Sequence, residues 1–125
     1  MILFGSSGDS NIENEIKEKM RYKPFSLIGK TTLKSLAAWI KRCSLFITND
    51  SGPMHIAAAV GTPIVAIFGS TDPFETSPLS DNYKIVRKPA DCSPCWKREC
   101  PTDHRCMELI KASDVMDVVK EMLKA

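Results

Sequence analysis

The stretch SLFITNDSGPMHIAAAVGTPIVAIFG, residues 44–69, carries the pattern that decides the fold class. Its first part, residues 44–48, is a short apolar run that favours a strand. Residues 53–60 suit a short helix, because a proline stands in the first turn and a glycine follows the last residue. Residues 63–68 form a continuous apolar run, typical of a strand buried on both faces. This order predicts a βαβ unit with parallel strands.

The same alternation continues on both sides of this stretch. Strands are expected at residues 1–5, 25–28 and 83–87, and helices at 11–20, at 32–42 behind an N-cap at Thr32, and from Ser113, which would cap the final helix. The residues expected on the buried helix faces are Ile12, Ile16, Met20, Leu33, Leu36, Ala37, Ile40, Val115, Val118, Val119 and Met122. Short strands alternating with helices predict an α/β fold with a Rossmann-like parallel sheet.

The composition bounds the function classes. A length of 125 residues suffices for one domain, and 43% hydrophobic with 26% charged residues is ordinary for a folded protein. A formal net charge of +2 is too small to indicate a nucleic-acid partner, and none is expected. The amino-terminal residues lack the pattern of a signal peptide, and Gly61 and Pro63 interrupt the longest apolar stretch. We therefore expect a soluble, cytoplasmic protein.

The residues between the first strand and the helix of this stretch carry the chemistry. Ligands of parallel α/β sheets bind at the carboxyl ends of the strands, where a helix start offers unpaired amides and a positive dipole end that suit a diphosphate. Gly52 would let the backbone approach the anion, and Asp50 would accept a hydrogen bond from a sugar hydroxyl. His55 would donate to a phosphate oxygen and stabilise a leaving diphosphate. The alternative is a plain N-cap and turn with a structural histidine.

Residues 46–73 resemble the signature of glycosyltransferase family 9, the ADP-heptose:lipopolysaccharide heptosyltransferases. The resemblance covers nearly the whole chain. Other matching pieces, in chain order, are Phe4-Gly5 followed by an acidic residue, residues 28–33, Ser77-Pro78, and the cysteine-containing residues 92–101.

The resemblance implies a GT-B glycosyltransferase, in which two Rossmann-like domains enclose the active site and heptose is transferred with inversion to the lipopolysaccharide inner core. This chain resembles the carboxyl-terminal, donor-binding domain. Asp50 would contact the sugar, and residues 51–55, Ser51-Gly52-Pro53-Met54-His55, would hold the diphosphate through backbone amides and His55. Gly29-Lys30-Thr31 would line the adenine. Asp9 stands where the family commonly has a ribose-binding Glu, and its side chain is shorter. The general base would come from the amino-terminal domain and is not in this chain.

We expect residues 1–125 to form this donor domain without its first strand and helix, which leaves a gap in the sheet. Re-pairing, a partner chain or strand exchange would close the gap, so a homodimer is one expectation. The lipopolysaccharide acceptor would bind through the other domain and bring the protein to the inner face of the membrane. Two other functions stay open: a non-catalytic nucleotide-binding or assembly module, and a zinc-stabilised interaction domain.

Four cysteines motivate the zinc alternative. Cys92, Cys95, Cys100 and Cys106 have the spacing C-x2-C-x4-C-x5-C, with His104 between the last two. One C-x2-C pair and two further soft ligands suit a tetrahedral zinc site. The alternative is a set of free or partly buried thiols in a long loop, because stable disulfides are disfavoured in the cytoplasm. The family resemblance requires no cofactor, so zinc is the one candidate.

Overall fold

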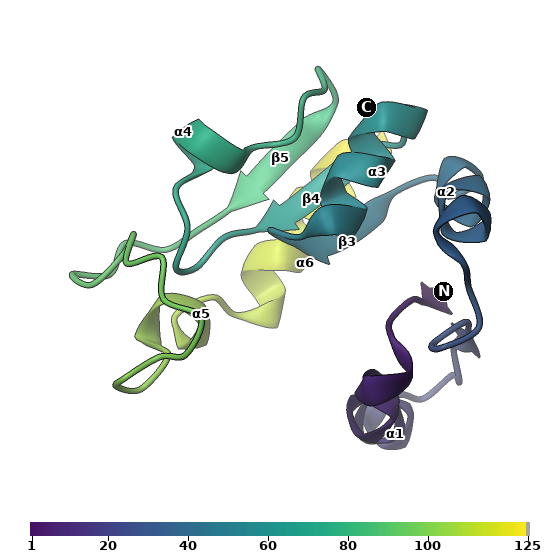
Figure 1. Ribbon diagram of the computed structural model, residues 1–125, viewed down its shortest axis with the longest axis horizontal. Coiled ribbons are helices and arrows are strands. Elements are labelled where there is room, and N and C mark those ends of the chain that lie inside the picture. The colour runs from purple at the N-terminus through teal and green to yellow at the C-terminus, as the bar shows by residue number, and fades with distance from the viewer. Residues whose placement is uncertain (125) are drawn as a thin grey trace. The chain divides into compact units, whose positions relative to one another are not determined.

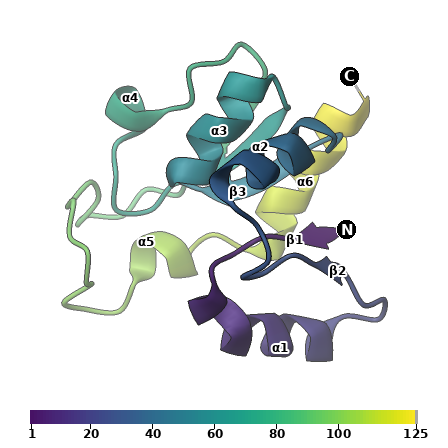
Figure 2. The same cartoon turned by 45° about the vertical axis from the view of Figure 1, so that its right-hand side comes forward.

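A computed structural model describes residues 1–124. It divides into two compact units, one ending at Trp39 and the other beginning at Ile40. Figures 1 and 2 together label their helices and strands, and each unit is considered by itself. Within residues 1–124, every helix is too short or too polar to cross a membrane.

The first unit is a small βαβ arrangement. It contains β1 (Ile2–Leu3), the 3-10 turn η1 (Ser7–Asp9), α1 (Ser10–Lys19) and β2 (Phe25–Ser26), and α2 (Leu33–Lys41) begins in it. β1 and β2 pair in parallel, with Ile2 opposite Phe25, and Figure 2 shows α1 alongside this pair. Two further amides extend the pairing, because Leu27 donates to the Leu3 carbonyl and Gly29 to the Gly5 carbonyl, each at 2.9 Å. The expected strand–helix–strand order is confirmed.

The second unit is built on a three-stranded parallel sheet. Its elements are β3 (Phe46–Asn49), α3 (Gly52–Val60), β4 (Ile64–Ile67), α4 (Pro73–Thr76), β5 (Tyr83–Val86), α5 (Arg105–Glu108) and α6 (Ala112–Lys124). The strand order is β3-β4-β5, and all pairs are parallel. β4 is central, and Ile64, Val65 and Ala66 are fully buried, as the apolar run predicts.

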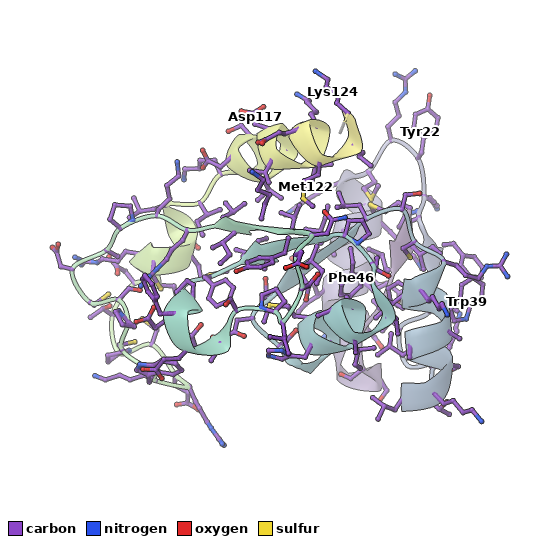
Figure 3. All side chains as sticks on the ribbon, turned by 90° about the horizontal axis from the view of Figure 1, so that it is seen from above. Tyr22, Trp39, Phe46, Asp117, Met122 and Lys124 are labelled. Atoms are coloured by element: carbon purple, nitrogen blue, oxygen red, sulfur yellow. The ribbon has the colours of Figure 1, made fainter. Side chains whose placement is uncertain are left out.

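Helices cover both faces of this sheet. Figures 1 and 3 show α3 on one face and α6 on the other. On the α6 side, Val65, Val86 and Val119 form a buried cluster. The partly buried residues packed against it are Leu45, Ile110, Val115, Val118 and Met122, which confirms the expected face of α6. In Figure 3, Met122 points toward the sheet, whereas Asp117 and Lys124 point away from it.

Three local expectations are wrong. Ser113 does not cap the final helix, because α6 already begins at Ala112 and the Asp114 carboxylate accepts from the Lys111 amide at 2.8 Å. Leu33 is 74% exposed and Ile12 is 57% exposed, although both lie on the apolar side of a helical repeat. Periodicity fixes the direction of a side chain, but not whether another segment covers it.

Candidate functional site

The β3–α3 loop, residues 50–55, comprises the two residues that follow β3 and the first turn of α3. The amide of Asp50 still donates to a carbonyl of β4, at 3.2 Å, so the loop starts from a fixed point at the sheet edge. Ser51 is the N-cap of α3 and is extended, with φ −162° and ψ 168°. Its hydroxyl lies 3.2 Å from Thr48 Oγ1 and donates to the Asn49 carbonyl at 3.1 Å. The N-cap side chain therefore leaves the first helix amides to other acceptors.

The backbone at the start of α3 is open beside Gly52. A Cβ added at Gly52 would meet no atom within 4 Å, so packing inside the described chain does not require glycine there. The first amides of a helix lack intrahelical acceptors and carry the positive end of the helix dipole. Within residues 1–124, neither Ser51 nor Gly52 donates its amide to a loop or turn carbonyl. The Met54 amide already donates to the Ser51 carbonyl at 3.1 Å, and Pro53 has no amide hydrogen. An anion would find its donors at Ser51 and Gly52.

The carboxylate of Asp50 is held by a residue that the sequence did not single out. Thr76, at the end of α4, donates its hydroxyl to Asp50 Oδ2 at 2.8 Å. The described hydrogen bonds of residues 1–124 include none to the second oxygen, Oδ1. A carboxylate accepts several hydrogen bonds, so Asp50 keeps acceptor capacity beside the backbone at Gly52.

The two residues that follow Pro53 have opposite surroundings. The Met54 side chain is fully buried and anchors the first turn of α3 in the core. His55 is exposed, so its imidazole can reach a ligand at the surface. The anchor and the candidate donor thus stand side by side in one turn. The buried residue fixes the position from which the exposed one acts.

The predicted nucleoside-binding residues lie at the carboxyl ends of β1 and β2, within the first unit. Gly29 has φ +68°, and a Cβ there would come within 3.1 Å of the Ser7 backbone, so both conformation and space require glycine. Lys30 and Thr31 follow directly, and the Lys30 side chain is exposed. Asp9 Oδ2 accepts from the Ser6 amide at 2.6 Å and from the Ser6 hydroxyl at 2.7 Å. The Ser6 hydroxyl, followed by its amide, lowers the pKa of Asp9, which keeps this carboxylate ionised.

The cysteine segment, residues 89–106, packs on the chain that follows β4. The amides of Cys95 and Trp96 both donate to the Ser70 carbonyl at 3.0 Å. The Ser93 hydroxyl donates to the Gly69 carbonyl at 2.5 Å and accepts from Arg87 at 3.0 Å. These contacts fix the start of the β4–α4 connection, which leads to Thr76.

The four cysteines of the zinc prediction do not converge on one point in this arrangement. Within residues 1–124, the structure has no group of three or more His, Cys, Asp or Glu side chains placed to hold a metal ion, and the thiols are free. Burial raises the pKa of Cys106, and the thiols of Cys92, Cys100 and Cys95 add to this. The zinc site stays a prediction.

Three contacting residues were missed from sequence: Thr76, Arg87 and Ser93. Thr76 lies 26 positions from Asp50 and Ser93 lies 24 positions from Gly69, whereas Arg87 is six positions from Ser93. No local pattern links such pairs. A cavity of about 390 Å³ is lined by Arg87, Pro89, Ala90 and Ser93, and no residue of the β3–α3 loop lines it.

The sequence model described as glycosyltransferase family 9 (heptosyltransferase) matches residues 1–105. The chain belongs to glycosyltransferase family 9. The matched region contains the β3–α3 loop, the candidate residues of the first unit and α4. It also contains Cys92, Cys95 and Cys100, whereas Cys106 lies one position beyond it.

Several members of glycosyltransferase family 9 are similar to this chain. Lipooligosaccharide heptosyltransferase 2 of Campylobacter jejuni is 39% identical over 130 residues, which cover 99% of this chain and 41% of that protein. Lipopolysaccharide heptosyltransferase 2 of Escherichia coli K12 is 37% identical over 91 residues, covering 70% of this chain and 26% of that protein. The chain therefore spans less than half the length of these relatives.

Solved structures of the family agree with the fold. The structure of the E. coli ADP-heptose lipopolysaccharide heptosyltransferase II matches with a TM-score of 0.81 and 30% identity, over 98% of this chain and 35% of that one. A family 9 glycosyltransferase from Veillonella parvula matches with a TM-score of 0.82 and 30% identity, over 99% of this chain and 36% of that one. The predicted α/β fold, corresponding to part of a GT-B heptosyltransferase, is confirmed.

Proposed function

We propose that this chain is the donor-binding part of a heptosyltransferase-like glycosyltransferase and binds ADP-heptose or a related nucleotide sugar. The observation that supports the proposal is the arrangement of polar groups in the β3–α3 loop. It combines an anchored carboxylate at Asp50 with unpaired backbone amides and open space at Gly52. A nucleotide sugar needs both features, because its hydroxyls donate hydrogen bonds and its diphosphate accepts them.

In this proposal, the diphosphate lies against the start of α3. The amides of Ser51 and Gly52 donate to its oxygens, and the nine-residue helix α3 directs its positive end toward the negative charge. His55 donates to a phosphate oxygen and stabilises the diphosphate as it leaves. Met54 contributes through its buried side chain, which fixes this turn, rather than through its amide.

Asp50 contacts the sugar rather than the diphosphate. Two negative groups in contact would repel, whereas a sugar hydroxyl donates to the carboxylate in a charge-assisted hydrogen bond. Thr76 already occupies Oδ2, so we assign the hydroxyl to Oδ1. This contact distinguishes a nucleotide sugar from the nucleotide alone.

The family resemblance, and not the arrangement of the two units, implies that residues of the first unit contact the nucleoside. Gly29-Lys30-Thr31 lines the adenine, and Asp9 accepts from a ribose hydroxyl through its second oxygen, since Oδ2 is bonded to Ser6. The side chain of Asp9 is shorter than the family's usual Glu, so this contact adds less than that of Asp50. The donor domain proposed here comprises residues 1–125, and no cofactor takes part in donor binding.

Transfer itself needs groups outside these contacts. We propose that an amino-terminal domain provides the general base and binds the lipopolysaccharide acceptor at the inner face of the membrane. Mixing this chain with such a domain, produced separately, and with ADP-heptose and a lipopolysaccharide acceptor tests the transfer, which is measured as heptose incorporated into the acceptor and ADP released. A pair that binds donor but never transfers would instead identify a nucleotide-binding or assembly module.

Isothermal calorimetry of ADP and of ADP-heptose tests donor binding directly. We expect the chain to bind both, and Asp50→Ala to weaken ADP-heptose about tenfold or more, because a hydrogen bond to a charged group contributes about 1.5–3 kcal/mol. ADP binding should stay unchanged or tighten slightly. Asp81→Ala is the matched control, since Asp81 is an exposed carboxylate outside the site. If the folded chain bound neither ligand, the proposal would fail.

A further inference from the structure

The short helix α4 holds its last residue in a fixed place. Asp72 caps the helix by accepting from the Phe74 amide at 3.0 Å, and Pro73 occupies the first turn. The amides of Glu75 and Thr76 both donate to the Asp72 carbonyl, at 3.0 and 3.1 Å. Figure 1 shows this turn near the carboxyl end of the sheet. The backbone that presents Thr76 is therefore set by its own turn.

The hydroxyl of Thr76 has one proton and two acceptors within reach. Asp50 Oδ2 lies at 2.8 Å and the Asp72 carbonyl at 3.2 Å. The Asp72 carbonyl already accepts hydrogen bonds from two amides. The Thr76 hydroxyl therefore donates to the carboxylate, where the hydrogen bond is shorter and charge-assisted. Both Thr76 and Asp50 are partly buried, which limits competition from water for this bond.

We propose that Thr76 is a positioning residue for Asp50, a role that rests on the donor-binding function proposed above. Its hydroxyl fixes the Asp50 side chain in one rotamer and occupies Oδ2, so that Oδ1 faces the donor sugar. A short carboxylate at the end of a strand otherwise samples several staggered rotamers. Because the Asp50 side chain is already fixed in the free chain, it loses less conformational entropy when the ligand binds.

Three variants separate the hydroxyl from the rest of the side chain. Thr76→Val keeps the β-branched shape and removes the hydroxyl, and Thr76→Ser keeps the hydroxyl. Thr71→Val makes the same chemical change within the β4–α4 connection, at a hydroxyl that no described hydrogen bond joins to Asp50. A variant that unfolds is recognised by its circular dichroism, and Thr76→Ala, which also removes the hydroxyl, then takes the place of Thr76→Val.

Calorimetry gives the first readout. We expect Thr76→Val to weaken ADP-heptose roughly two- to tenfold, the range for one side chain that must be immobilised on binding, and to leave ADP unchanged. Thr76→Ser and Thr71→Val should bind like the unaltered chain. Thr76→Val should have no further effect when Asp50 is already alanine. Equal weakening of ADP and ADP-heptose, or an effect that persists without Asp50, would overturn the positioning role.

A second readout needs no ligand. Three-bond couplings measured by NMR report the χ1 angle of Asp50 in the free chain. We expect a single rotamer in the unaltered chain and in Thr76→Ser, and averaged couplings in Thr76→Val. Unchanged couplings in Thr76→Val would overturn the inference whatever the ligand does. A fixed rotamer in a chain that binds no nucleotide sugar would overturn the proposed function instead, and the contact would then be structural.

Discussion

The β3–α3 loop and the cysteine segment are held in place by different means. The loop belongs to one βαβ unit, so a strand ladder, a helix start and the fully buried Met54 fix it. The cysteine segment includes only the first two residues of the short helix α5, and hydrogen bonds to the carbonyls of Gly69 and Ser70 fix its start. A site made from regular elements can be recognised from local patterns, whereas a segment held by distant carbonyls cannot.

The two regions also differ in what their buried residues do. Met54 is 0% exposed and sits within the candidate site, whereas Cys106, 7% exposed, ends a segment whose other cysteines are more exposed. We therefore expect the loop to unfold only with the core. The cysteine segment should open by itself, because few buried apolar contacts resist its opening.

The largest expected effect comes from removing the anchor of the loop. Met54→Ala should lower the free energy of unfolding by about 2–5 kcal/mol, because it deletes a fully buried side chain and leaves a cavity. Urea denaturation followed by circular dichroism measures the change. The neighbouring His55→Ala, at an exposed position, should stay within about 0.5 kcal/mol of the unaltered chain. If both variants lowered the free energy of unfolding equally, the different roles given to the buried Met54 and the exposed His55 would be wrong.

A smaller and more local effect is expected in the cysteine segment. Ser93→Ala removes the bond to the Gly69 carbonyl and the bond from Arg87, and should destabilise the closed segment by about 1–2 kcal/mol. Amide hydrogen exchange at Cys95 and Trp96 should then quicken about tenfold, since 1.4 kcal/mol is a factor of ten. Ser113→Ala, at an exposed position on α6, is the control. Uniform quickening across β4 as well would mean that the segment does not open separately.

A pH-dependent contribution is expected where the segment joins α6. Lys88, just before the segment, donates to Asp114 at 2.9 Å, and this contact, followed by the Lys111 amide, lowers the pKa of Asp114 below its ordinary 3.8. The resulting stability is complete above about pH 4 and is lost as the pH falls through the lowered pKa. Asp114→Asn should therefore be less stable than the unaltered chain at pH 7, with a difference that shrinks below pH 4.

Thermal unfolding from pH 7 to pH 2 measures that difference. Asp117→Asn makes the same charge change on α6, at a side chain that points away from the sheet (Figure 3). It should shift the midpoint less at every pH. A difference for Asp114→Asn that stays constant down to pH 2 would rule out the ion pair with Lys88 as its source.

The smallest expected effect is that of a metal chelator. The start of the cysteine segment is held by hydrogen bonds to Gly69 and Ser70, so EDTA should leave the thermal midpoint of the reduced chain unchanged. Elemental analysis of the purified chain accompanies this measurement. A fall in the midpoint, abolished in Cys95→Ser, would establish the four-cysteine zinc site and give the segment a stronger restraint than the loop has.

The sequence predicted those parts of the structure in which neighbouring residues determine the outcome. The apolar run of β4, the helix marked by Pro53 and Gly61, and the apolar face of α6 follow from local patterns. Leu33 was placed wrongly because periodicity does not show which segments cover a helix. Thr76 could not be found, because its contact with Asp50 forms only after two distant connections meet at one sheet edge. The ligand roles inferred from the sequence, including that of Asp9, remain predictions.

The empty space beside Gly52 makes this position a reporter of ligand binding. Since a methyl group there meets no atom of the described chain, alanine at residue 52 carries no steric penalty for folding. It also suits a helix better than glycine does. A requirement for glycine at this position would then come from a ligand that lies against the backbone. The tolerance of position 52 to substitution thus measures how closely the ligand approaches, separately from the stability of the fold.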